Sequence, residues 1–145
     1  VTVASPAYLA RHGEPATVDD LEGHRAVDYV SSSTGRSVPL DFMVDGRNVL
    51  ARPGSVVSVD GAELYASAAL AGLGLIQVPR YRVADDLAAG RLKEVLPGAP
   101  PAPMPVSVLY PQNRQVSARV RVFSQWLAEI FGQAFGPAAQ TMPVR

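Results

Sequence analysis

The stretch that decides the fold runs from Ser58 to Arg80 and reads Ser58-Val-Asp-Gly-Ala-Glu-Leu-Tyr-Ala-Ser-Ala-Ala-Leu-Ala-Gly-Leu-Gly-Leu-Ile-Gln-Val-Pro-Arg80. Its first half predicts a helix. Asp60 is a favourable N-cap, and Glu63 stands where a carboxylate can reach back to form a capping box. Residues 62–73 are nearly all small or apolar, so we expect a helix covered on most sides rather than along one stripe.

The second half of this stretch predicts a turn followed by a buried strand. Gly72 and Gly74 end the helix, because glycine tolerates the backbone conformations found just after a helix. The apolar run from Leu75 to Val78 is typical of a parallel strand, and Pro79 ends it. A helix that begins directly after an extended segment offers unpaired N–H groups to an anionic or polar ligand. Residues 58–61 are therefore the first candidate binding site.

Strands and helices alternate through the rest of the chain. Ser5-Pro6 is a cap followed by proline at the first helical position, which predicts a helix to His12 that stops at Gly13. Asp45-Gly46 between two strand-like runs predicts a β-hairpin. The order of elements predicts an α/β domain with a mixed sheet flanked by helices. The other expected elements are a helical turn at 17–20, strands at 25–30, 38–44, 48–52, 54–59, 91–96 and 106–110, a helix at 81–89, a proline-rich linker at 97–105, an amphipathic helix from residue 116 and a frayed tail at 132–145.

The composition limits the classes of function. The 145 residues suffice for one domain with its own core. Thirteen basic residues balance thirteen acidic ones and are scattered, so no nucleic-acid surface is indicated. There is no cysteine, which excludes disulfides and thiolate metal sites. No apolar run reaches membrane-spanning length and no signal-peptide pattern is present, so we expect a cytoplasmic domain without a membrane partner.

A polar loop follows the expected strand at 25–30. Ser31, Ser32, Ser33 and Thr34 offer hydroxyls and free backbone N–H groups that could hold a carboxylate or another polar ligand. The alternative is a flexible turn, since serine and glycine are common turn residues. Ligands of open α/β sheets bind beyond the carboxyl ends of the strands, which makes these four residues candidate ligand contacts.

The segment before the long helix carries the second set of candidates. Ser58, Val59, Asp60 and Gly61 either bind a ligand or serve only to begin the helix. Asp60 would repel an anion unless the helix N-terminus absorbs its charge. Gln77, inside an apolar strand, needs a hydrogen-bond partner, and either a ligand or a neighbouring backbone could supply it.

The sequence shows no pattern typical of an enzyme or a metal site. His12 and His24 have no metal-ligand spacing to each other or to an acidic residue, so both are expected to be structural or at the surface. No Gly-X-Ser-X-Gly motif, phosphate-binding glycine loop or pair of carboxylates on an apolar background is present. We therefore expect no catalysis, no metal and no cofactor.

An ordered set of segments resembles the effector-sensing domain of LysR-type transcriptional regulators. No single segment is specific, but the set extends over roughly residues 3–131. The segments are Ala4-Ser-Pro-Ala-Tyr-Leu-Ala-Arg-His-Gly13, Asp19-Asp-Leu-Glu-Gly-His24, Thr34-Gly-Arg36, Ala69-Leu-Ala-Gly-Leu-Gly-Leu-Ile-Gln-Val-Pro79, Leu87-Ala-Ala-Gly-Arg-Leu-Lys-Glu-Val-Leu-Pro97, Val108-Leu-Tyr-Pro111 and Arg119-Val-Arg-Val-Phe123.

The resemblance implies a two-lobed, type 2 periplasmic-binding-protein-like fold that binds a small-molecule effector between its lobes. The effector would be an organic acid or an aromatic compound. Residues 1–131 would form an effector-binding domain that lacks half of the first lobe, and residues 132–145 a flexible tail. DNA would be bound only through an absent N-terminal winged helix-turn-helix. The family's cleft is lined by the loop at 31–34. Many relatives carry Asn-Asp where this chain has Val59-Asp60, so one ligand hydrogen bond is in doubt.

The resemblance also implies self-association, because sensing domains of this family pair side by side. Two other functions remain open at this point. One is a lobe of a periplasmic-type solute-binding protein, which shares the fold. The other is a fragment of a hydrolase, against which the missing nucleophile motif argues.

Overall fold

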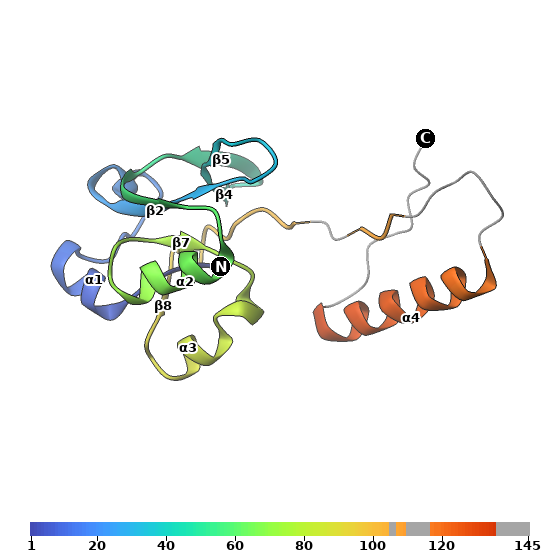
Figure 1. Cartoon of the computed structure of the whole chain (residues 1–145). Helices are drawn as coiled ribbons and strands as arrows, with labels where there is room; N and C mark the ends of the chain where they lie inside the picture. Colours follow the sequence, from blue (N-terminus) through green and yellow to red (C-terminus); the bar gives the residue numbers. More distant parts are fainter. Residues whose placement is uncertain (105–106, 110–116, 136–145) are drawn as a thin grey trace. The chain divides into compact units, whose positions relative to one another are not determined.

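The structure is a computed structural model that describes residues 1–104, 107–109 and 117–135. The chain divides into two compact units, Val1–Ala102 and Pro103–Arg145, and each is described by itself. Within the described residues, the first unit contains the eight strands and the helices α1 to α3, and the second unit contains α4 (Figure 1). The alternation of strands and helices in the first unit confirms the α/β class.

The first ladder is centred on β1 (Thr2–Ala4), which lies between β7 (Ile76–Gln77) and β8 (Lys93–Val95). Both neighbours are antiparallel to β1. Leu75, just before β7, makes an isolated parallel bridge with Ala26. The predicted parallel direction is therefore correct for Leu75 and wrong for β7. The apolar run indicates that both faces of the strand are buried, and a strand of either direction, parallel or antiparallel, can be buried in this way.

The second ladder is mixed. β2 (Arg25–Val30) pairs in parallel with β6 (Gly54–Val59) and antiparallel with β3 (Ser37–Val38). The strands predicted at 25–30 and 54–59 are confirmed at these bounds. Because β2 and β6 run in the same direction, the segments that follow them leave the sheet at the same edge.

The third ladder is the predicted hairpin, formed by β4 (Leu40–Val44) and β5 (Arg47–Ala51). Asp45 and Gly46 connect the strands with φ angles of 49° and 75°. Two successive left-handed residues define the type I′ turn, whose twist matches that of the strands on either side. Aspartate and glycine are among the few residues that accept this geometry, so the turn residues identify the hairpin.

α1 (Pro6–His12) has the predicted boundaries. The Ser5 hydroxyl accepts a hydrogen bond from the backbone N–H of Tyr8, and Gly13 follows the helix at φ 81°. The helical turn predicted at 17–20 is a 3₁₀ helix at Asp19–Gly23. Both elements begin close to the residues whose side chains favour a helix start.

α2 (Ala62–Leu70) lacks the predicted capping box. Its N-cap residue is Gly61, in an extended conformation and without a side-chain cap hydrogen bond, so Asp60 lies one residue too early to cap. Glu63 does not reach back but forms an ion pair with Arg82 at 2.6 Å. The prediction that Asp60 and Glu63 cap the helix is therefore wrong, because the helix begins one residue later than the spacing suggests.

Two glycines carry the chain from α2 into the first ladder. Gly72 has a φ of 77°. Gly74 lies against β2, where an added Cβ would be 2.7 Å from the carbonyl oxygen of Arg25 and 2.9 Å from the carbonyl carbon of Ala26. The N–H of Leu75 donates to the same Arg25 oxygen at 2.9 Å. The helix ends before the apolar run does because the chain turns here to lie beside β2, where Leu75 is bridged to Ala26.

The helix predicted at 81–89 is divided. A 3₁₀ turn covers Arg80–Arg82 and α3 covers Ala84–Ala88. Between them Val83 is fully buried, with a φ of −121° that leaves the helical region. The prediction is correct for the second half and wrong for the first, because burial of Val83 takes priority over a continuous helix.

The first unit has two buried clusters of apolar side chains. One packs around α2 and β7, and the other around α1, β4 and the end of β8. The first cluster contains Val3, Val27, Tyr65, Ala68, Ala69, Ile76, Val78, Val83 and Leu92. The second contains Ala4, Tyr8, Leu21, Ala26, Leu40, Phe42, Leu75, Val95 and Leu96.

The second unit contains α4 (Ala118–Phe135), the predicted amphipathic helix. It includes the first four residues of the predicted tail, and residues 136–145 lie outside the described residues. Ser107–Leu109 form no strand, so the strand predicted at 106–110 is not found there, and its two ends also lie outside the described residues. No helix in the described part of the chain is long and apolar enough to cross a membrane.

Candidate functional site

The two polar segments singled out in the sequence meet at one edge of the second ladder. The parallel register places Asp28 beside Ser58 and Tyr29 beside Val59. Residues 31–34 follow β2, and residues 60–61 follow β6. We call residues 31–34 and 58–61 together the strand-end site, since carboxyl ends of parallel strands are where α/β domains bind ligands.

The loop after β2 is closed by its own hydrogen bonds. The Ser31 N–H donates to the Arg36 carbonyl at 2.9 Å, and the Thr34 N–H to the Ser31 carbonyl at 3.3 Å. The hydroxyls of Ser31 and Ser33 lie 2.9 Å apart. The N–H groups of Ser32 and Ser33 have no partner among the described residues. The loop is therefore held in shape while two of its amides remain available to a ligand.

The segment at the end of β6 is less uniform. The Ser58 hydroxyl donates to Asp28 Oδ2 at 3.0 Å. Val59 is half-buried against the cluster around α2. Asp60 is exposed, and Gly61 begins the helix. Within the described structure the N–H groups of residues 62–64, at the start of α2, have no partner, so they too could receive an anion or a polar group.

Asp28 is a residue of this region that the sequence analysis missed. Its carboxylate accepts hydrogen bonds from the hydroxyls of Ser58 and Ser37. The side chain is half-buried, and no cation of the described residues forms a salt bridge with it. The available signal was an aspartate inside the strand Arg25–Val30, because aspartate is depleted in strands.

A pair of tyrosines supports the same edge from the α2 side. The rings of Tyr29 and Tyr65 lie 5.2 Å apart at 57°. The Tyr65 hydroxyl accepts a hydrogen bond from the Gln77 N–H at 3.2 Å. Burial raises the pKa of Tyr65, and the charge of Asp28 raises it further. Tyr65 therefore stays neutral and joins the end of β2 to β7.

Gln77 joins two ladders. Its Oε1 accepts from the Asp41 N–H at 2.9 Å, and its Nε2 donates to the Asp41 carbonyl at 2.7 Å. Nε2 also donates to the Thr2 hydroxyl at 3.1 Å. Both N–H donors of the amide and one acceptor position are thus in use. This arrangement favours a backbone partner, the second of the two possibilities, and attaches the hairpin to the first ladder.

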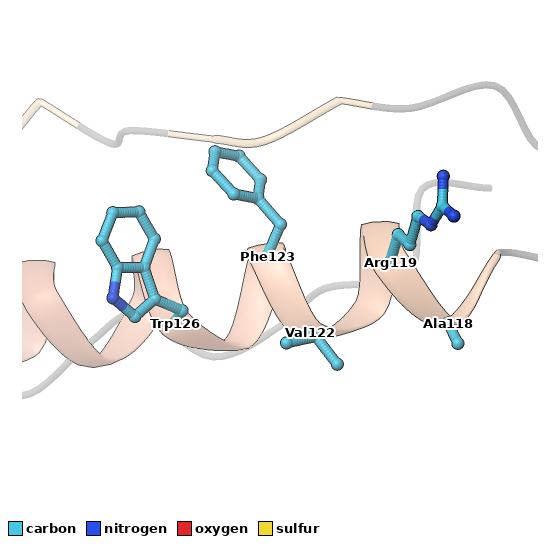
Figure 2. Close-up of a pocket in the computed structure, with 5 residues that line it drawn as sticks. All are labelled: Ala118, Arg119, Val122, Phe123 and Trp126. Carbon is cyan, nitrogen blue, oxygen red and sulfur yellow. The ribbon is translucent and has the colours of Figure 1, made fainter.

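Two surface hollows of the described residues lie away from the strand-end site. In the first unit, a hollow of about 810 Å³ is lined by residues 14–19 and 96–99 together with Val44 and Val49. In the second unit, a hollow of about 530 Å³ lies on α4, where Figure 2 shows Phe123 and Trp126 projecting from the same side of the helix. Neither lining includes a residue of the strand-end site.

Both histidines have structural neighbours. His24 Nδ1 lies 3.1 Å from the Tyr8 hydroxyl, and the ring of His12 stacks on that of Tyr8 at 4.5 Å. Burial lowers the pKa of His24, with the charge of His12 as a smaller cause and Asp20 opposing both. The described residues contain no group of three or more side chains that could hold a metal ion.

Comparison with known proteins identifies the domain. Residues 1–132 match the family model of the LysR substrate binding domain. The uncharacterized HTH-type transcriptional regulator YhjC of Escherichia coli K12 is 45% identical over 132 residues, which cover 90% of this chain and 44% of that protein. The HTH-type transcriptional repressor PA14_22550 of Pseudomonas aeruginosa UCBPP-PA14 is 30% identical over 141 residues, covering 97% and 44%. The chain spans less than half the length of these curated relatives.

Solved structures of LysR-type regulators are similar to this chain as well. The regulatory domain of CrgA from Neisseria meningitidis, a LysR-type transcriptional regulator, superposes with a TM-score of 0.60 at 27% identity and covers 90% of this chain and 63% of that one. CrgA itself gives a TM-score of 0.64 at 25% identity, covering 90% and 44%. The fold is therefore the type 2 periplasmic-binding-protein-like fold of these regulatory domains. The chain belongs to the LysR substrate-binding domain family and is an effector-binding domain of that type.

Proposed function

We propose that this domain binds a small-molecule effector at the strand-end site and thereby controls DNA binding by an N-terminal winged helix-turn-helix of a longer protein. One observation carries the proposal. In a LysR-type domain, parallel β2 and β6 bring two polar segments with unpaired backbone N–H groups to one sheet edge. The relatives' names support the DNA-binding part, since they are HTH-type regulators.

The effector class follows from the donors at the site. Ser32, Ser33 and the first turn of α2 present N–H groups, which suit the carboxylate of an organic or aromatic acid. Of the nine sequence candidates, we keep the eight residues of the strand-end site as contacts and assign Gln77 to the support of β4. Ser58 contributes through its bond to Asp28.

The remaining partners are proposed on the same basis. We expect DNA to be reached only through the helix-turn-helix, because the net charge of this chain is zero. We expect the domain to work by binding rather than catalysis, in the cytoplasm where the DNA lies, without a membrane partner, and to self-associate. The role of a periplasmic solute-binding lobe is not favoured, because the relatives named above are HTH-type regulators.

A proline substitution tests the proposed contact at α2. Ala62 is the first helical residue after Gly61, a position that accepts proline, and the extended Gly61 is compatible with a following proline. Ala62→Pro removes one N–H donor without interrupting the helix. We expect carboxylates that shift the amides of residues 31–35 and 58–64 in NMR titrations to bind about tenfold more weakly to this variant.

Ala62→Gly is the matched control, because it changes the side chain and keeps the N–H. We expect this control to bind as the unchanged chain does. Ligand-induced shifts confined to α4, or to the hollow at residues 14–19 and 96–99, would place the site elsewhere and contradict the proposal.

A further inference from the structure

The hydroxyl protons around Asp28 are already committed. A serine hydroxyl has one proton to donate. Ser58 donates its proton to Oδ2 of Asp28, and Ser37 donates its proton to Oδ1. Both hydroxyls therefore face any ligand as acceptors. Ser37, Asp28 and Ser58 thus form an acceptor-rich cluster, although hydroxyls alone would have suggested donors for an anion.

The charge of this cluster is not balanced within the described residues. The salt bridges there are formed by other acids, and none involves Asp28. A carboxylate has about four acceptor positions, of which the two serines use two. Asp28 is half-buried, while Ser37 and Ser58 are exposed. A partly desolvated carboxylate with open acceptor positions and an accessible surround favours a ligand that donates a hydrogen bond to it.

The cluster also lies next to the amides that suit an anion. Asp28 is two residues before the end of β2, and Ser58 one residue before the end of β6. Ser37 is paired with Val30 across the loop of residues 31–36. The same end of the sheet therefore presents both unpaired N–H groups and a negative acceptor cluster. A plain carboxylate would meet the repulsion of Asp28, whereas a molecule with both kinds of group would satisfy both parts.

We propose that the effector carries an ammonium or hydroxyl donor beside its carboxylate, and that Asp28 receives this donor. The proposal rests on the proposed function and adds a specificity-determining residue to it. Amino acids and hydroxy acids are the matching chemical classes. Unsubstituted carboxylic acids of the same carbon skeleton are disfavoured.

Matched acids test the proposal on the whole 145-residue chain. Each set keeps the skeleton and changes only the donor: 3-phenylpropionate, 3-phenyllactate and phenylalanine form one set, and succinate, malate and aspartate form another. Binding is followed by the amide shifts of residues 31–35 and 58–64 and by the carboxyl ¹³C shift of Asp28. We expect the donor-bearing members to bind about tenfold or more tightly than the plain acid and to move the Asp28 signal.

Asp28→Asn should abolish most of this preference, since it removes the negative charge and keeps the side-chain size. Asp45→Asn is the control. Asp45 lies in the exposed hairpin turn at φ 49°, a conformation that asparagine accepts, so the preference should remain. A second readout on the unchanged chain keeps the test decisive if Asp28→Asn fails to fold. The donor-bearing acids should move the carboxyl ¹³C signal of Asp28, and the plain acids should move it much less.

Four results would overturn the proposal. Equal binding of plain and donor-bearing acids at the strand-end site would reject the role of Asp28 and leave the proposed function standing. A preference that survives in Asp28→Asn, or an Asp28 carboxyl signal that the donor-bearing acids do not move, would do the same. Absence of shifts at residues 31–35 and 58–64 with every acid would reject the proposed effector site together with this inference.

Discussion

The two units of the chain differ in how far the phenylalanine and tryptophan rings compared below are buried. In the first unit, Phe42 is fully buried within a cluster that extends from β1 to β8. In α4, Phe123 and Trp126 are 55% and 51% exposed, although their rings lie 5.7 Å apart. The first unit thus buries Phe42 by folding, while α4 carries two aromatic rings that stay about half exposed on one side of the helix (Figure 2).

This difference shows what an amphipathic pattern can and cannot establish. The helical spacing of apolar residues in α4 predicts the helix correctly, but the spacing does not say what covers the apolar face. Exposed apolar area of this kind marks interaction surfaces. We therefore expect the stability of the chain to depend on the first unit and its association to depend on α4.

Two phenylalanine substitutions should show the largest contrast between the units. Phe42→Ala removes a fully buried ring and leaves a cavity, so we expect it to lower the free energy of unfolding by about 3–5 kcal/mol. Phe123→Ala removes a ring that is more than half exposed and should change this free energy by less than about 0.5 kcal/mol. Urea unfolding followed by circular dichroism measures both. Equal effects would show that α4 is part of the same core.

Glycine substitutions should give the next effect. An alanine Cβ at Gly74 would meet the β2 backbone at 2.7 Å, so Gly74→Ala must push the segment at residues 74–75 away from β2. We expect a loss of roughly 1–3 kcal/mol, the usual cost of overpacking, in the same urea experiment. Gly23 is the matched control, since nothing lies within 4 Å of an added Cβ there. A neutral Gly74→Ala variant would mean that the turn tolerates a shift of the backbone.

Local chemistry explains which elements could be predicted from the sequence. Asp45-Gly46 and Ser5-Pro6 specify backbone geometry directly, and the structure confirms the hairpin and α1. The sequence also placed two polar segments after strands, and the parallel register of β2 and β6 brings them to one edge.

Other features depend on contacts between distant residues, which a local pattern does not contain. The partner of β7 is β1, more than seventy positions earlier, so the apolar run could not give its direction. Asp28 acquires its environment from Ser37 and Ser58, which lie nine and thirty residues away. Capping by Asp60 failed for a smaller reason, a shift of one residue in the helix start.

Association should respond to α4 more than to the first unit. We expect the mass from light scattering to rise with concentration, because the exposed apolar face gains by being covered. Trp126→Glu places a charge in that face and should weaken association about tenfold or more. Leu50→Glu is the control, an apolar position on β5 of the first unit that is at least as exposed as Trp126. A monomer at all concentrations, or a larger effect of Leu50→Glu, would contradict the assignment.

The smallest expected effect is a pH dependence that belongs to the first unit alone. Burial lowers the pKa of His24 below the ordinary value near 6.5, and α4 contains no histidine. Between the folded and unfolded pKa values the unfolded chain binds more protons, so stability falls as the pH falls through about 6.5 and levels off below the folded pKa. Urea midpoints at pH 7.5 and 5.5 should therefore differ, with the lower midpoint at pH 5.5.

Two variants test whether His24 causes this difference. His24→Gln should be less stable than the unchanged chain at pH 7.5, because the contact with the Tyr8 hydroxyl is altered. Its urea midpoints at the two pH values should be nearly the same. His12→Gln, which changes an exposed ring, should keep most of that difference. A midpoint that rises on acidification would show that the folded state, rather than the unfolded chain, takes up the proton.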